Sequence, residues 1–245
     1  MTSKEHEALL KELQNGDQLK AYKEKYDNLP CGFLPRFFAK ILFGTIDIMY
    51  GSEPSLQKFK VLEVVARVPY QTWEFVSYLA TTNFYNNEKR AIDYACIADF
   101  GKFAQDNETM HVVVISHICK QEKVGNWFAH TFIPIIMAYI YMIISTVLYL
   151  LDRKHSYELN YMFEDHAYSQ YTIFLEKNKE SLKSKPIHSE FLNYYGRVCD
   201  NQYDFFESVK NDEIIHRNES AVEMVKDNGN MMTDFIDDTF DLDKN

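Results

Sequence analysis

The sequence is poor in the residues that interrupt regular structure. It has eight glycines and six prolines among 245 residues, which argues against a β-sandwich with its frequent turns and against a disordered chain. Cysteine is scarce too, and Cys31, Cys96, Cys119 and Cys199 form no Cys-x-x-Cys pair. Neither a disulfide framework nor a thiolate zinc site is therefore predicted.

Positive charge is in deficit. The chain has 26 Lys and Arg against 36 Asp and Glu, a formal net charge of −10. A nucleic-acid backbone is bound by a basic surface, so no nucleic-acid partner is expected. The N-terminal stretch "MTSKEHEALLKELQNGDQ" has neither the apolar core of a secretory signal nor the Arg and Ser richness of a transit peptide. The sequence therefore does not identify a particular membrane or organelle.

Apolar residues recur at helical spacing along most of the chain, and no competing strand alternation is present. This spacing predicts an all-α protein with four long helices and several shorter ones. In chain order the predicted helices cover residues 4–27, 36–51, 55–85, 88–119, 132–151, 156–182 and 190–226. We interpret the pattern as a ferritin-like four-helix bundle with two accessory helices.

Composition divides the chain into three parts. Residues 1–35 are predicted to form a helical arm and a linker, which ends in the Pro- and Gly-containing "NLPCGFLP". Residues 36–226 would hold the bundle, including a stretch at 36–51 that suits an amphipathic helix on a bilayer surface. Residues 227–245, "DNGNMMTDFIDDTFDLDKN", are acidic and are predicted to be a flexible tail.

Two Glu-x-x-His motifs lie in two of the four long helices. The first is Glu108 and His111, and the second is Glu213 and His216. Residues three apart on a helix share one face, so each motif presents a carboxylate and an imidazole to the same ion. One such motif arises readily by chance, whereas an ordered pair is informative.

Each of the other two long helices offers a single glutamate in an apolar setting. Glu63 lies within "FKVLEVVARV", and Glu164 follows Met162 and Phe163; an unpaired carboxylate is costly to bury in such places. A di-iron carboxylate bundle combines one Glu from each of two helices with Glu-x-x-His from each of the others. The predicted ligands are Glu63, Glu108, His111, Glu164, Glu213 and His216.

The predicted ligand set favours iron over zinc. Four carboxylates and two imidazoles nearly neutralise two divalent ions and leave positions for dioxygen, whereas structural zinc favours thiolates and a closed shell. Two iron ions are therefore the predicted cofactor. Asn107 and Asp212 each precede a motif glutamate, and they are candidates either to orient the imidazoles or to lie on a helix surface.

The segment 132–151, "FIPIIMAYIYMIISTVLYLL", has no charge over twenty residues and is long enough to cross a bilayer. A crossing would put Glu108 and His111 on one side and Glu164, Glu213 and His216 on the other. If the metal site exists, this helix must instead be buried in the bundle, lie in a dimer seam or sink into one leaflet. The alternative is a metal-free membrane protein with 132–151 as a true span.

Five segments together resemble the alternative oxidases over residues 55–220. They are "VLEVVARVPY" (61–70), "NETMH" (107–111), "FEDHAYSQYTIFL" (163–175), "NYY" (193–195) and "NDEIIH" (211–216). The chain is most similar to the plastid terminal oxidase branch, through "ARVPY" and the Glu-x-His-Ala of residues 164–167.

The resemblance implies a non-haem di-iron quinol oxidase. Such an enzyme couples oxidation of a quinol, plastoquinol or ubiquinol, to four-electron reduction of dioxygen to water without pumping protons. In that family Glu108 and Glu213 would bridge the two irons, and Glu63 and Glu164 would be terminal ligands. Tyr171 would be catalytic, as a redox or proton relay.

The resemblance also implies a substrate pocket, a homodimer and attachment to one membrane leaflet. The pocket residues would be Lys58, Leu62, His166, Gln170 and Tyr171. Lys58 stands where the family usually has Arg, and Gln170 where it usually has Thr. The alternative functions are a di-iron hydroxylase of a quinone precursor or lipid, and a ferritin-like iron-binding protein.

Overall fold

The computed structural model describes residues 3–226, and within that range the regular elements are helical. The all-α class is thereby confirmed, while the tail predicted for 227–245 lies outside the described residues. The elements are α1 (Ser3–Glu12), α2 (Gly16–Glu24), α3 (Phe33–Tyr50), α4 (Leu56–Asn83), α5 (Glu88–Gln121), the π-helical turn η1 (Phe128–Phe132), α6 (Ile133–Leu151), α7 (Arg153–Lys183), α8 (Glu190–Tyr195) and α9 (Gln202–Val225).

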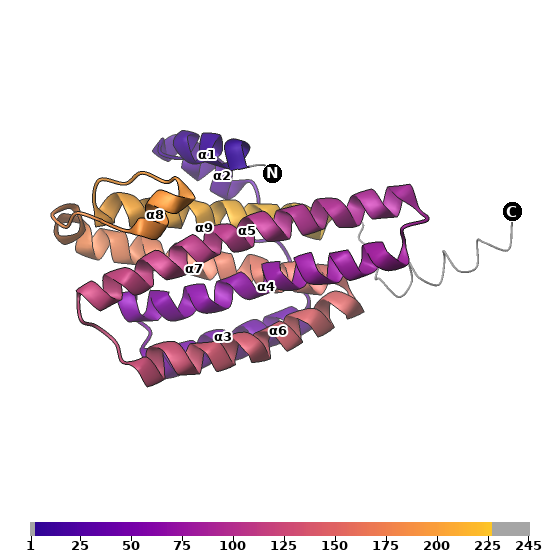
Figure 1. Cartoon of the computed structure of the whole chain (residues 1–245), viewed down its shortest axis with the longest axis horizontal. Helices are drawn as coiled ribbons and strands as arrows, with labels where there is room; N and C mark the ends of the chain where they lie inside the picture. Colours follow the sequence, from indigo (N-terminus) through magenta and orange to yellow (C-terminus); the bar gives the residue numbers. More distant parts are fainter. Residues whose placement is uncertain (1–2, 227–245) are drawn as a thin grey trace, which may run out of the picture.

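The long helices α4, α5, α7 and α9 form the bundle, and α3 and α6 lie along one side of it (Figure 1). α4 packs against α5, and α7 packs against α9. α3 contacts α7, and α6 contacts both α4 and α7, while α1 lies against α9. The predicted four-helix bundle with two accessory helices is confirmed, and the short helices α1, α2 and α8 are added to it. The proposed boundaries between arm, bundle and tail remain predictions.

Each bundle helix begins at a side-chain cap. Ser55 accepts a hydrogen bond from a first-turn amide of α4, and Asn87, Asp152 and Asn201 do the same for α5, α7 and α9. Such caps satisfy amides that have no partner inside the helix, and each stabilises it by about 1 kcal/mol. The starts of the long helices are therefore set locally.

Two helices predicted as continuous are each broken, and in both cases the prediction was wrong. The predicted helix 4–27 is divided into α1 and α2, because Asn15 caps α2 by accepting from the amide of Asp17. The predicted helix 190–226 is divided into α8 and α9, because Gly196 takes a left-handed conformation with φ of 91°. Glycine adopts that conformation without steric cost and commonly ends helices.

α4 and α5 approach closely at a glycine. A Cβ added to Gly101 would lie 2.8 Å from the backbone oxygen of Tyr70 and 3.0 Å from the backbone nitrogen of Glu74. Such distances leave no room for a side chain, so Gly101 permits the two backbones to come together. This contact fixes the height of α5 relative to α4 and therefore the level at which their carboxylates meet.

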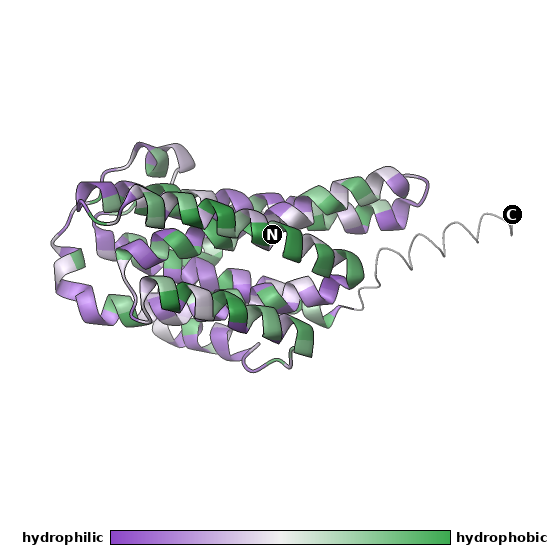
Figure 2. Cartoon of the chain, turned by 90° about the horizontal axis from the view of Figure 1, so that it is seen from below, coloured by the Kyte–Doolittle hydropathy of each residue, from purple (hydrophilic) through white to green (hydrophobic). Residues whose placement is uncertain are grey.

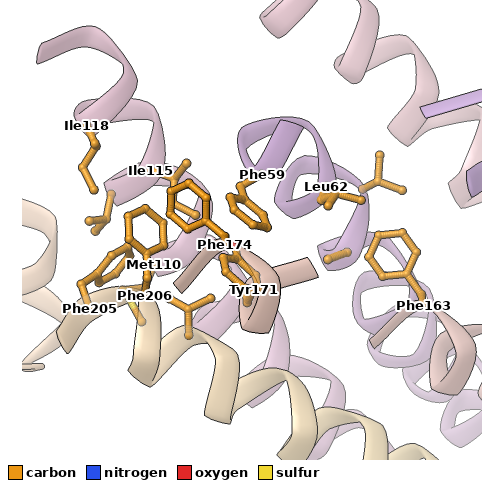
Figure 3. Close-up of a cluster of buried hydrophobic side chains, with 14 of the residues drawn as sticks. Phe59, Leu62, Met110, Ile115, Ile118, Phe163, Tyr171, Phe174, Phe205 and Phe206 are labelled. Carbon is orange, nitrogen blue, oxygen red and sulfur yellow. The ribbon is translucent and has the colours of Figure 1, made fainter. Parts of the chain in front are cut away.

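Aromatic rings fill part of the interior of the bundle (Figure 3). Phe59 stacks on Tyr171 with ring centroids 4.0 Å apart and an interplanar angle of 5°. Phe174 meets Phe59 edge to face at 5.0 Å, and Phe206 lies 6.2 Å from Tyr171. Burying one such ring stabilises the fold by about 1.5–3 kcal/mol. The cluster gives the neighbouring polar groups a dry and rigid boundary.

α3 and α6 are rich in apolar residues, which are green in Figure 2, and many of these side chains are exposed. Within residues 3–226, one helix is long and apolar enough to span a membrane: Phe128–Leu151, whose most apolar stretch has a mean hydropathy of 2.1 and is 28% buried. Its neighbour α3 adds further exposed apolar side chains. The exposed large side chains on the two helices include Phe33, Phe37, Ile41, Ile48, Ile135, Ile136, Tyr139, Ile140, Ile143 and Val147.

Candidate metal centre

The six predicted ligands converge in two overlapping groups at the middle of the bundle. Within each group, one potential ligand atom per residue lies within 4.8 Å of the others. One group is Glu63, Glu108, His111 and Glu213, and the other is Glu108, Glu164, Glu213 and His216. Glu108 and Glu213 belong to both groups, so they have the position of ligands shared between two ions. Glu63 and Glu164 each belong to one group.

The donor atoms fit two iron ions. All six side chains are buried, with at most 1% of their surface exposed. Within the described residues, both oxygens of Glu213 and Oε2 of Glu164 lack a hydrogen-bond partner. Leaving such groups unpaired costs several kcal/mol each, and a bound cation would remove that cost. Mixed carboxylate and imidazole ligands from four helices are the donor set of di-iron bundles.

The carboxyls differ in their affinity for protons. Burial raises the pKa of Glu63 and of Glu164 to about 7, and the charge of Glu108 adds to both shifts. Burial, ahead of the charge on Glu108, also raises the pKa of Glu213 well above its ordinary value. For Glu108 burial acts in the same direction, but the neighbouring imidazoles, His111 foremost, outweigh it and lower the pKa. Iron must therefore displace protons from this centre in order to bind.

The convergence of these residues constrains α6. Glu108 precedes α6 in the sequence and Glu164 follows it, yet both belong to the same group of potential ligands. A helix that crossed a bilayer between them would place them on opposite sides. α6 therefore lies along the bundle, in contact with α4 and α7, as the sequence argument requires.

Asp212 holds the imidazole of His111. Its Oδ2 lies 2.8 Å from Nε2 of His111, which leaves Nδ1 facing the carboxylates. Arg197 donates to both oxygens of Asp212, and His6 Nε2 lies 2.6 Å from Oδ1. Burial works to raise the pKa of Asp212, but the charge of Arg197 and the bonds from the two histidines hold it well below its ordinary value. A charged carboxylate beside the imidazole fixes its orientation.

Asn107, the other candidate for orienting an imidazole, has a different set of contacts. Its Nδ2 donates to the hydroxyl of Tyr195 at 3.0 Å and approaches Oδ2 of Asp212 at 3.5 Å. Within residues 3–226, Asn107 makes no hydrogen bond to an imidazole. It therefore acts on His111 through Asp212. Both residues are buried, so the alternative of a helix-surface position is wrong for each.

A tyrosine contacts each of the two glutamates that belong to one group only, Glu63 and Glu164. Tyr171 donates a hydrogen bond to Oε1 of Glu63. Tyr70 donates to Oε1 of Glu164 at 2.7 Å. Burial raises the pKa of both phenols well above the ordinary value, and the charge of the contacted glutamate adds to it, so both keep their protons.

Tyr70 was missed in the sequence, although a signal for it was present. Tyr70 lies seven residues after Glu63, as Tyr171 lies seven residues after Glu164. His6 and Arg197 were also missed, and their contacts with Asp212 span 206 and 15 residues. No local sequence pattern predicts such contacts, because they depend on how α1 and the loop after α8 fold back onto α9.

Two of the predicted pocket residues, Lys58 and His166, contact α3. Lys58 is buried, and its Nζ donates to Asp47 at 2.7 Å, to the backbone oxygen of Ser52 at 3.0 Å and to Gln170 at 3.3 Å. The charge of Lys58 is thus satisfied within the protein, where it joins the end of α3 to α4 and α7.

His166, Leu62 and Tyr171 complete the predicted pocket set. The ring of His166 stacks on Phe43 of α3 at 4.4 Å, whereas Leu62 and Tyr171 are buried in the same core cluster as Phe163. The structure therefore brings Lys58 and Gln170 into contact and places the other three against the α3 side or the core. Their role in binding a substrate remains a prediction.

Comparison with known proteins places the chain in a family. Residues 18–222 match the family described as alternative oxidase. Ubiquinol oxidase 4, chloroplastic/chromoplastic, of Arabidopsis thaliana is 27% identical over 202 residues, which cover 74% of this chain and 54% of that protein. The chain thus spans about half the length of the curated relative that it matches.

The family match includes all six clustered residues, and the two buried Glu/His groups are consistent with the di-iron centre of that family. Four bundle helices supply the groups, and α3 and α6 supply the apolar side expected of interfacial membrane proteins. With most of its length matched and its metal-binding groups in place, this chain belongs to the alternative oxidase family.

Proposed function

We propose that this protein is a non-haem di-iron quinol oxidase. It would oxidise two quinols to two quinones, and the four electrons and four protons released would convert one dioxygen to two waters. The observation that carries the proposal is the pair of buried groups sharing Glu108 and Glu213, found in a chain whose residues 18–222 match the alternative oxidases.

The six ligands would hold two iron ions, which supply the binding and reduction of dioxygen. The protein fixes their positions through its own contacts: Asp212 holds His111, and the two tyrosines hold Glu63 and Glu164. The surrounding aromatic cluster excludes water, so charges in the centre are poorly screened. Tyr171 is the proposed catalytic tyrosine, because its phenol is buried between Phe59 and the ligand carboxylate.

Quinol access is proposed from the apolar side. A groove of about 210 Å³ lies between α3 and α6. Tyr141 lines the groove and is itself buried. Burial raises the pKa of its phenol, and the charge of Glu164 adds to that shift. A quinol ring and its isoprenoid tail suit such a lining. The groove residues are Phe38, Ile41, Leu42, Thr45, Met137, Ile140, Tyr141 and Ile144.

We further propose that the head group is recognised near the end of α3. The substrate-binding residues would be Lys58, Leu62, His166, Gln170 and Tyr171. Their position between α3, α4 and α7 supports this proposal, since Lys58 and Gln170 are joined by a hydrogen bond beside the ring of His166. Polar groups of this kind, held beside the apolar helix α3, would orient a quinol.

The protein is proposed to be peripheral, attached to one leaflet through α3 and α6, and to act as a homodimer. The exposed apolar residues on these helices support the attachment. An enzyme held on one leaflet takes up and releases protons on the same side of the membrane, so its reaction would pump none. The dimer rests on the family resemblance.

The test is oxygen uptake by the purified, iron-loaded protein with plastoquinol and ubiquinol analogues. We expect uptake at two quinols per dioxygen, with all isotopic label from dioxygen recovered in water. Label in the organic product would instead indicate a hydroxylase. Iron binding without uptake for any quinol would indicate an iron-binding protein of ferritin type.

A further inference from the structure

Tyr70 and Tyr171 are related by a repeat within the bundle. Each lies seven residues after a terminal glutamate, Glu63 on α4 or Glu164 on α7. Seven residues are nearly two helical turns, so each tyrosine shares a face with its glutamate. Because α4 and α7 run in opposite directions (Figure 1), each tyrosine is level with the glutamate of the other helix. The hydrogen bonds accordingly cross, Tyr171 to Glu63 and Tyr70 to Glu164.

Within residues 3–226, the oxygen of Tyr70 has two hydrogen-bond partners, whereas that of Tyr171 has one. The Tyr70 hydroxyl donates to Oε1 of Glu164 at 2.7 Å and accepts from Nδ2 of Asn160 at 2.9 Å. The same Nδ2 also donates to the hydroxyl of Ser220 at 3.0 Å. All four side chains are at most 1% exposed. A polar chain from α9 through α7 and α4 therefore ends on one ligand carboxylate.

This arrangement leaves one oxygen of Glu164 for a metal. Oε1 is occupied by Tyr70, whereas Oε2 has no hydrogen-bond partner within the described residues and belongs to the group with His216. We infer that Tyr70 is a positioning residue for the second iron, the one held by Glu164 and His216, and that Asn160 sets the direction of its hydroxyl. The inference rests on the di-iron centre of the proposed function.

The inference is specific to one of the two irons. Glu63 and His111 of the other group are contacted by Tyr171 and Asp212, and Tyr70 forms no hydrogen bond to either within residues 3–226. The ring of Tyr70 also packs against His216, with centroids 5.3 Å apart, and Tyr70→Phe keeps this packing while removing the hydroxyl. Loss of the Tyr70 hydroxyl should therefore affect one iron and leave the other as it was.

The test compares Tyr70→Phe with the unaltered full-length protein by anaerobic titration with ferrous ion and by Mössbauer spectroscopy. The ring can stay in place, since Phe retains the packing against Trp73 at 5.1 Å and Phe100 at 5.9 Å. Loss of a group that orients a ligand typically weakens metal binding by about 10–100-fold. We expect that loss for one iron, with a changed signal for that iron and an unchanged signal for the other.

Three further variants make the result interpretable. Tyr161→Phe removes a buried hydroxyl on α7 that donates to the backbone oxygen of Tyr26 at 2.7 Å, so it should change neither iron signal. Asn160→Ala frees the Tyr70 hydroxyl to rotate, so it should weaken binding of the same iron by a smaller factor. This variant tests the role of Tyr70 even if Tyr70→Phe folds poorly. Tyr171→Phe should alter the signal of the other iron.

Unchanged affinity and signals in Tyr70→Phe would overturn the inference while leaving the di-iron centre intact. Equal weakening of both irons would also overturn it. Failure of the unaltered protein to bind iron is a separate result, because it would remove the proposed centre itself.

Discussion

Asp212 lies directly before one motif glutamate, yet its carboxylate holds the histidine of the other motif, with Oδ2 2.8 Å from Nε2 of His111. The two Glu-x-x-His helices are thus joined by a bond outside the set of potential ligands. Arg197 and His6 contact the same carboxylate, so α1 and the loop after α8 converge on the group that holds this imidazole.

Asp212→Asn should weaken iron binding and destabilise the fold. The amide cannot balance the buried charge of Arg197, and breaking such a buried pair costs about 3–5 kcal/mol. The imidazole also loses its fixed orientation, which should lower iron affinity by about 10–100-fold. Chemical denaturation and competition with a chelator measure the two effects. Asp204→Asn on the same helix is the control, and equal losses in both variants would contradict the account.

Glu63→Ala and Glu108→Ala should differ in iron content. Glu108 belongs to both groups of potential ligands, whereas Glu63 belongs to one. Loss of Glu108 should abolish binding of both irons and quinol-dependent oxygen uptake together, whereas loss of Glu63 should weaken one iron. Metal analysis after gel filtration measures this difference. Retention of both irons by Glu108→Ala would show that it is not a shared ligand.

The iron-free protein should lose stability as pH rises from the ordinary carboxyl range to about 7. Glu63 and Glu164 have pKa values raised to about 7 by burial and the charge of Glu108. The folded state therefore keeps protons that the unfolded state has lost, and stability falls as pH rises. Each shift corresponds to about 3 kcal/mol. The pKa of His111 is also raised, mainly by carboxylates that outweigh burial, and it acts in the same direction.

Thermal melts across this pH range would measure the effect, and the double variant Glu63→Gln and Glu164→Gln should flatten the slope. Stability that increases with pH in the unaltered, iron-free protein would contradict the raised pKa values.

Filling the groove between α3 and α6 should impair substrate access without removing iron. Ile140 lines the groove, so Ile140→Trp should raise KM for quinol by about tenfold or more, if one obstructed apolar contact costs 1–3 kcal/mol. Ile143 is exposed on the same helix outside the lining, and Ile143→Trp is the matched control. Steady-state oxygen uptake measures KM; the same KM in both variants would argue for another entry route.

The arrangement of the bundle was predictable because its signals are local. Helical spacing and the positions of Glu63, Glu108, Glu164 and Glu213 give both the class and the order of ligand helices. The breaks before Gly16 and after Tyr195 were missed, since periodic apolar residues continue past Asn15 and Gly196 and conceal the caps.

The network around the ligands was only partly predictable. Asp212 was a candidate because it adjoins Glu213, but its partners Arg197 and His6 come from segments that only the tertiary fold brings close. To predict a role for Tyr70, one had to recognise that its spacing from Glu63 matches the spacing of Tyr171 from Glu164. The groove between α3 and α6 depends on two helices far apart in the sequence and has no sequence signal of its own.

Anomalous diffraction at the iron absorption edge, from crystals of the iron-loaded protein, tests the central claim most directly. The account predicts two peaks between Glu108 and Glu213, one beside His111 and the other beside His216. A single peak, or iron bound only elsewhere on the protein, would contradict it.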